Sequence, residues 1–306
     1  MKHIVLDTDP GVDDAHAIML ACAHPGAKVE ALTTVAGNVS LERATRNALI
    51  ILEVIGQAVP VFPGCADALV RPTPRRAISH GTDGLGDSGY PDPVRQAEAE
   101  HAVPALIRMA NAASGELTLA ALGPLTNIAL ATCLDPTLPH KYKRLVVMGG
   151  AIYAKGNSWE RAAEFNFYCD PEAAAIVFER WPGLTLVCWE TTLAHGLQPQ
   201  QAQALAQGDT PRADLFRRTT QGRFVTQDSG QRVLSAPDAL AVAVALEPEI
   251  VQQVETRYVE IELAGRMTRG QTVVDWYDLA NHAHNASLVL EVDRERYWEL
   301  LKLSLR

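Results

Sequence analysis

The stretch HIVLDTDPGVDDAHAIMLACA, residues 3–23, decides the fold of this chain. Residues 3–6 form an apolar run of the length of a buried strand, and residues 13–23 repeat apolar side chains with the period of an α-helix. Pro25 and Gly26 follow and end that helix. The stretch therefore predicts a strand, an acidic turn and a helix, which form the first unit of an α/β fold.

The same alternation continues to the end of the chain. Strands are expected at residues 29–35, 59–62, 117–122, 144–148, 184–189 and 286–292, and an antiparallel pair at 254–263 and 272–276. Helices are expected at residues 13–23, 41–55, 100–112, 125–134 and 171–181, in two polar segments between 199 and 227, from 237 onward, and at the C-terminus. Because parallel strands need crossover connections, we expect a single domain over residues 1–306. Its fold class is α/β, with a mainly parallel, Rossmann-like open sheet, helices on both faces, and a small antiparallel element near the C-terminus.

Composition and charge limit the kinds of partner. The chain has 306 residues, of which 47% are hydrophobic and 21% charged, in the range of soluble globular proteins. A formal net charge of −9 argues against a nucleic-acid surface, which needs clustered Lys and Arg, and favours a small molecule together with a cation. No apolar run is long enough for a signal peptide or a membrane span, so we expect a cytoplasmic protein with no membrane partner. The five cysteines lack C-x-x-C spacing and predict neither disulfides nor a zinc site.

Four aspartates fall within eight residues after the first strand, at Asp7, Asp9, Asp13 and Asp14. A polar turn explains one such residue, but four like charges resist ionising together unless a cation or tight hydrogen bonding offsets them. The segment does not fit the twelve-residue calcium loop of an EF-hand, nor an aspartyl phosphatase, because Pro10-Gly11 falls at the wrong place. Oxygen ligands of this kind suit a hard cation, either Ca²⁺ or Mg²⁺.

Several segments resemble blocks of one enzyme family. Residues 7–15, DTDPGVDDA, look like the opening signature of the inosine-uridine preferring nucleoside hydrolases. Further similar blocks follow in order: residues 33–39 (TTVAGNV), 123–129 (GPLTNIA), 147–150 (VMGG), 163–167 (AEFNF) and 170–173 (DPEA). The resemblance covers nearly the whole chain. It implies a calcium-dependent hydrolase that cleaves the N-glycosidic bond of a ribonucleoside to give ribose and free base, and a homotetramer or homodimer.

The resemblance also implies a role for each polar position. Calcium would be held by Asp9, Asp14, the backbone carbonyl of Leu122, and Asp238. Asp9 would accept the proton of a metal-activated water as the general base. The positions expected to contact the substrate are Asp13, Asn38, His80, Met148, Asn157, Glu164, Asn166 and Asp238.

Simpler structural roles remain open for several of these positions. Asn38 could cap the helix that begins near Ser40, and Asp238 could serve the N-terminus of its own helix. Glu164 and Asn166 flank an apolar residue as in a half-buried strand or turn. The segment from Asn157 to Glu164 is one residue longer than the family spacing.

The chain departs from the family where the base would leave. Inosine-uridine enzymes have a histidine before the late metal-binding aspartate, but here Pro237 precedes Asp238. His80 lies in the irregular segment of residues 63–93, a candidate lid or binding loop, although a lone loop histidine is more often solvated. Other residues that could meet the base, or lie in the core, are Trp189 at a strand end, Trp276 and Tyr277, and Arg223 and Phe224 on a polar helix. Because of Pro237, a ribosyl-binding protein of low or no turnover is the alternative function.

Overall fold

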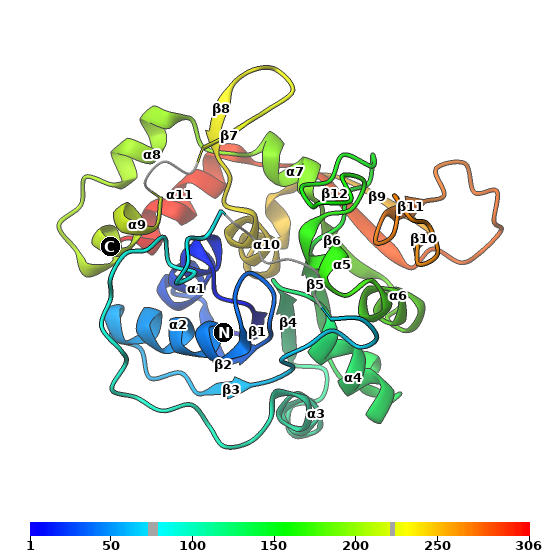
Figure 1. Cartoon of the computed structure of the whole chain (residues 1–306), viewed down its shortest axis with the longest axis horizontal. Coiled ribbons are helices and arrows are strands. Elements are labelled where there is room, and N and C mark those ends of the chain that lie inside the picture. Colours follow the sequence, from blue (N-terminus) through cyan, green and yellow to red (C-terminus); the bar gives the residue numbers. More distant parts are fainter. Residues whose placement is uncertain (73–78, 221–223) are drawn as a thin grey trace.

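The strand that opens the chain lies near the centre of an eight-stranded sheet (Figure 1). The structure, a computed structural model, describes residues 1–72, 79–220 and 224–306. The sheet has the order β3-β2-β1-β4-β5-β6-β12-β9, in which every neighbouring pair is parallel except β12 and β9. Its strands are β1 (Lys2–Thr8), β2 (Ala27–Thr34), β3 (Val61–Pro63), β4 (Leu117–Ala121), β5 (Arg144–Met148), β6 (Leu184–Val187), β9 (Val251–Arg257) and β12 (Ala286–Val292). The expected fold class is confirmed.

Helices cover both faces of the sheet and bury two separate cores. On β1, Ile4 and Leu6 belong to one core and Val5 to the other, as the alternation of side chains along a strand requires. The first core is packed by α1 (Val12–Ala23), α2 (Leu41–Val54), α8 (Pro199–Leu205), α9 (Pro211–Thr220), α10 (Pro237–Leu246) and α11 (Arg294–Ser304). The second is packed by α3 (Ala102–Ala112), α4 (Thr126–Leu134) and α6 (Pro171–Arg180).

Helix starts follow the capping residues in the sequence. Ser40 accepts a hydrogen bond from Arg43 N at the start of α2, as expected. Asp170 caps α6, whose first residue is Pro171, and Asp293 caps α11. Among the described residues, no helix combines the length and apolarity that crossing a membrane requires.

Two short sheets complete the fold. The strands β10 (Val259–Ile261) and β11 (Thr272–Val274) form a small antiparallel pair near the C-terminus, as expected. The single strand predicted over residues 254–263 is wrong, because residues 254–257 belong to β9, which pairs with β12 in the main sheet. The strands β7 (Phe224–Thr226) and β8 (Arg232–Leu234) form a hairpin that the sequence did not predict. The second polar helix was expected within a segment reaching residue 227, but α9 ends at Thr220, and a turn closed by Gly230 at φ +80° returns the chain to β8.

Two further short helices lie at the carboxyl edge of the sheet. The prediction of a strand over residues 184–189 was too long, because Trp189 is already the first residue of α7 (Trp189–Ala194). Residues 165–169 form α5 (Phe165–Cys169) rather than a half-buried strand. Figure 1 shows α5, α7 and the starts of α1 and α10 around one region beside the sheet.

Candidate active site

Asp9 is fully buried just after the end of β1. Its Oδ2 accepts a hydrogen bond from Asn38 N at 2.6 Å. Within the described parts of the chain, no residue hydrogen-bonds its Oδ1. Two glycines make room for this carboxylate, since a Cβ would lie 2.1 Å from Oδ2 at Gly37 and 2.7 Å from Oδ1 at Gly123. Glycine at these two strand ends therefore lets the backbone pass close to the Asp9 carboxylate.

Asp14 is also fully buried and organises the turn into α1. Its Oδ2 accepts a hydrogen bond from Gly11 N at 2.8 Å, and its Oδ1 accepts one from the Thr8 hydroxyl. The side-chain amide of Asn38 lies 3.4 Å from the same Oδ2. Asn38 therefore binds Asp9 and Asp14 instead of capping α2, which is the role of Ser40.

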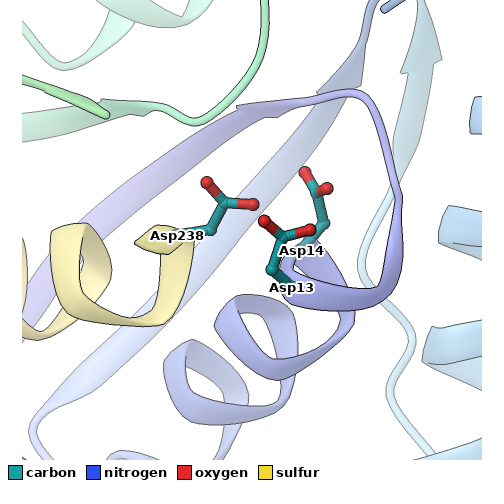
Figure 2. Close-up of side chains that lie close together, drawn as sticks. All are labelled: Asp13, Asp14 and Asp238. Carbon is teal, nitrogen blue, oxygen red and sulfur yellow. The ribbon is translucent and has the colours of Figure 1, made fainter. Parts of the chain in front are cut away.

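Three carboxylates from two helix starts converge on one point. Asp13 and Asp14 lie in the first turn of α1, and Asp238 in the first turn of α10. One oxygen of each lies within 4.8 Å of the others (Figure 2). Oxygen atoms in this number and spacing are able to hold a hard cation.

Burial and mutual repulsion raise the pKa values of these acids. Burial, followed by the charge of Asp14, raises the pKa of Asp9 well above its usual value. Burial, followed by the charges of Asp13, Asp14 and Asp9, has the same effect on Asp238. The pKa of Asp14 rises to about 6, again mainly through burial. A bound cation would offset this repulsion, and the buried Oδ1 of Asp9, to which no described residue donates a hydrogen bond, fits the same requirement.

Asn166 and Glu164 join this site to the ends of two further strands. Asn166 Nδ2 donates to the backbone oxygens of Leu122 at 2.9 Å and Met148 at 3.2 Å. Glu164 caps α5 by accepting from Asn166 N at 2.9 Å, and it also accepts from Gly150 N at 3.0 Å. Burial raises the pKa of Glu164 to about 7.

Asp7 has a different place from the other acids of the segment. Its Oδ1 accepts hydrogen bonds from Thr33 Oγ1 at 2.5 Å and Asn127 Nδ2 at 2.8 Å, which link β1 to β2 and α4. It is fully buried and does not line the cavity described next. Asp7 therefore has a structural role, because it connects β1 with β2 and α4.

A cavity of about 450 Å³ opens above the acidic cluster. Asp9 and Asp14 lie beneath its surface, fully buried. The other positions predicted to bind substrate or metal all line it: Asp13, Asn38, His80, Leu122, Met148, Asn157, Glu164, Asn166 and Asp238. The structure thus brings together residues that come from most of the length of the chain.

His80 is buried in the cavity wall and is not a solvated loop residue. Its Nδ1 accepts a hydrogen bond from Val12 N at 3.2 Å and lies 3.5 Å from Asp13 Oδ1. The loop that carries it is tied to the acidic segment by Asn47, which donates to Pro10 O at 3.0 Å and Asp83 O at 2.9 Å.

The aromatic candidates divide into two groups. Trp189 lines the cavity, but as part of α7. Trp276 stacks on Tyr153 with ring centroids 5.5 Å apart, and Tyr277 is 83% exposed; neither is among the described lining residues. Phe224 lies on β7, not on a helix, and Arg223 falls outside the described residues.

Several lining residues were not predicted from the sequence. They are Val12, His16, Ser79, Ser158, Trp159, Phe165, Thr219, Thr220, Val225, Leu234, Ser235 and, as a wall residue, Pro237. His16 follows Asp13 by three positions on α1, a spacing that places both on one helix face. Burial lowers the pKa of His16 to about 3, so this ring is neutral. Its Nε2 lies 3.3 Å from Thr219 Oγ1.

Comparison with known proteins shows the family to which the chain belongs. The family model for the inosine-uridine preferring nucleoside hydrolases matches residues 4–299. The chain is similar to the pyrimidine-specific ribonucleoside hydrolase RihA of Salmonella paratyphi B, with 36% identity covering 97% of this chain and 96% of the relative. It is also similar to the inosine-uridine preferring nucleoside hydrolase of Crithidia fasciculata, with 34% identity covering 98% and 96%.

A solved structure of an inosine-guanosine nucleoside hydrolase superposes with a TM-score of 0.92 at 33% identity, covering 99% of this chain and 98% of that one. The match runs through the sheet, both helical layers and the segments that carry the carboxylates. The chain therefore belongs to the inosine-uridine preferring nucleoside hydrolase family and is an N-glycosidase that hydrolyses ribonucleosides.

Proposed function

We propose that this enzyme uses a calcium ion bound beneath its cavity to hydrolyse the N-glycosidic bond of a ribonucleoside. The observation that carries the proposal is the convergence of Asp13, Asp14 and Asp238 at the cavity, with Asp9 buried beside them. The ion would be held by Asp9, Asp14, the carbonyl oxygen of Leu122, and Asp238. Calcium accepts six to eight oxygen ligands in irregular geometry, which suits a mixed set of carboxylate and backbone oxygens.

Asp9 is proposed as the general base. When bound, the cation lowers the pKa of water and orients the ribose hydroxyls. The raised pKa of Asp9 supports the role, because a carboxylate of higher proton affinity accepts a proton more readily near neutral pH. Its Oδ1 is the atom that accepts no hydrogen bond from the described residues, and so is the atom assigned to the water.

The remaining polar residues are proposed to hold the ribose. Those assigned to its hydroxyls are Asp13, Asn38, Asn157, Glu164 and Asn166, with Met148 against the sugar. Glu164 is supported by its fixed orientation, since three backbone N–H groups hold its carboxylate. A carboxylate placed there also stabilises the positive charge that develops on the ribose as the base departs.

His80 is proposed as a further substrate contact. Its Nδ1 accepts from Val12 N, so in the neutral ring the proton lies on Nε2, which can donate to a substrate oxygen or nitrogen. Pro237 lines the cavity with no ionisable group. Help for the departing base therefore has to come from a residue other than the one before Asp238.

The names of the relatives cover pyrimidine, inosine-uridine and inosine-guanosine enzymes. We therefore propose nucleosides of both base classes as candidate substrates, for a cytoplasmic homotetramer or homodimer. Light scattering on the purified protein tests the assembly. A monomer at micromolar concentration would contradict it.

The decisive experiment measures ribose release from uridine, cytidine, inosine, guanosine and adenosine, with calcium and with excess chelator. We expect release from at least one nucleoside, loss of release with the chelator, and recovery with Ca²⁺ but not with Mg²⁺ at equal concentration. Recovery with Mg²⁺ alone would reject calcium. If no nucleoside releases ribose while calorimetry shows calcium-dependent ribose binding, the ribosyl-binding alternative replaces the catalytic proposal.

A further inference from the structure

The loop between β5 and α5, residues 149–164, carries a large aromatic side chain to the cavity. Trp159 lines the cavity while 48% of its surface is exposed. Its indole ring adds broad, flat apolar surface to the cavity wall.

Hydrogen bonds within the loop fix the position of Trp159. Gly156 N donates to Arg161 O at 2.7 Å, and Arg161 N donates back to Ser158 O at 3.1 Å. Ser158 Oγ donates to Ala163 O at 2.7 Å. Arg161 adopts φ +59°, in the left-handed region, and so closes the turn. Trp159 therefore lies at the tip of a closed turn and not on an open strand of chain.

The same loop is joined to residues assigned to the ribose. Asn157 Oδ1 accepts a hydrogen bond from Phe165 N at 2.8 Å, next to Glu164. Lys155 forms an ion pair with Asp228, in the turn of the β7–β8 hairpin. The hairpin also supplies Val225 and Leu234 to the cavity wall, so the loop and the hairpin face the same space.

The clustered aspartates and the large apolar side chains of the cavity wall come from different elements. Asp13, Asp14 and Asp238 converge at the starts of α1 and α10. Trp159, Trp189, Val225 and Leu234 come from other elements and supply apolar surface. A ribonucleoside has the same division, with hydroxyls on the sugar and flat π-faces on the base.

We propose that Trp159 is a specificity-determining residue that stacks on the nucleobase of the bound substrate. The inference rests on the proposed function, because it takes the ribose to lie against the acidic cluster. Stacking on an indole tolerates different bases, since every base has a π-face. Trp159 then determines preference for an aromatic aglycone over a non-aromatic one, whatever the identity of the base.

The test compares nucleoside binding with ribose binding in the calcium-loaded enzyme. Trp159→Ala should raise the KM for nucleosides roughly 5- to 100-fold, while the inhibition constant of free ribose stays within about twofold of wild type. Trp159→Phe keeps an aromatic face and should recover most of the loss. Trp276→Ala is the matched control, because Trp276 stacks on Tyr153 and is not among the described lining residues.

Tryptophan fluorescence provides a readout that a structural role would not change. Rapid mixing with nucleoside should quench the wild-type emission before turnover, and this quench should be clearly smaller in Trp159→Phe, in which Trp189 is the remaining described tryptophan of the cavity wall. An unchanged KM in Trp159→Ala, a parallel rise in the ribose inhibition constant, or an equal quench in Trp159→Phe would overturn the proposal. If the wild type releases no ribose, the proposed function fails, and calorimetric affinities for nucleoside and ribose on the same variants still decide the role of Trp159.

Discussion

At the scale of single residues, the proposed role of Asp9 as the general base can be tested by a single substitution. Asp9→Asn keeps an oxygen to accept the hydrogen bond from Asn38 N but cannot take a proton from water. We expect turnover to fall by about 10²-fold or more, as for the loss of a general base. Steady-state rates measure this effect, and the thermal unfolding midpoint in excess calcium should stay near that of wild type. Turnover at the wild-type rate in a folded variant would remove Asp9 from the mechanism.

A substitution at Pro237 tests how the departing base is protonated, because it adds a group to the site and does not remove one. It is the first residue of α10, where the backbone N–H has no partner within the helix, so replacing proline costs little. Pro237→His should raise the turnover number at least about tenfold for nucleosides whose bases leave poorly, since it adds a general acid. It should have little effect on 4-nitrophenyl riboside, whose leaving group needs no proton. Pro237→Ala serves as the control, and equal rates in the alanine and histidine variants would show that leaving-group help is supplied elsewhere.

The site residues were predicted because their motifs resemble those of a known family, as was the case for Asp9, Asn38 and Leu122. The physical reason that these three lie together is that parallel strands bring their carboxyl ends to one edge of the sheet. His16 and Trp159 could not be placed in this way. Whether the face of α1 that bears His16 meets another helix or a cavity depends on where α9 and α10 pack. Trp159 depends on the conformation of an irregular loop, which short-range sequence patterns do not determine.

At the scale of elements, the turns after the strands set the geometry of the carboxylates. Gly123 follows β4, and an added Cβ would lie 2.7 Å from Asp9 Oδ1. Gly123→Ala should therefore displace the Asp9 carboxylate and lower turnover by about 10- to 100-fold, because small displacements of reacting groups are costly. Gly26→Ala is a suitable control, since its nearest contact would be the His24 side chain at 3.2 Å, at the opposite edge of the sheet. Steady-state turnover of both variants measures the effect. Equal turnover in the two variants would mean that the loop accommodates the added methyl group without displacing Asp9.

The elements also show why some predictions succeeded. The strands β5 and β12 have the predicted bounds, because both are mainly apolar segments of strand length bounded by polar residues. The hairpin β7–β8 lacks such a run. Its strands have three residues each and are stabilised by pairing with residues far apart in the sequence. Leu234 and Leu197 each donate a backbone N–H to the carbonyl oxygen of the other. The short α5 likewise depends on Glu164, whose carboxylate accepts a hydrogen bond from Gly150 N at the other end of the irregular loop that precedes the helix.

At the scale of the whole molecule, the fold directs the first turns of α1 and α10 to the same point, and those two helices pack together. The positive ends of the helix dipoles favour the carboxylates at each start. They do not cancel the repulsion among the clustered acids, as the raised pKa values of the buried Asp9, Asp14 and Asp238 indicate. The active site therefore carries a cost in stability when no cation is present.

This cost predicts a pH dependence that calcium should reverse. A carboxyl group whose pKa is higher in the folded state stabilises the fold at low pH, and that stabilisation is lost as pH rises through the folded-state pKa. The ordinary carboxyl pKa of about 4 in the unfolded chain, and folded-state pKa values of about 6 for Asp14 and about 7 for Asp7 and Glu164, place the loss between about pH 4 and 7. In chelator, the unfolding midpoint should therefore fall across this range.

The proposed calcium ion would bind the ionised carboxylates, so the stabilisation it adds should grow over the same range, reaching about 2.7 kcal/mol when its free concentration is 100 times Kd. Calorimetric unfolding from about pH 4 to 8, in chelator and in calcium at equal ionic strength, measures the difference between the two curves. Groups distant from the cluster, such as Glu247 with its pKa lowered to about 2 by Arg296, contribute equally to both curves and cancel. The neutral His16 ring should cancel in the same way. A difference that stayed constant with pH would mean that calcium does not bind these carboxylates, and would reject the acidic cluster as the metal site.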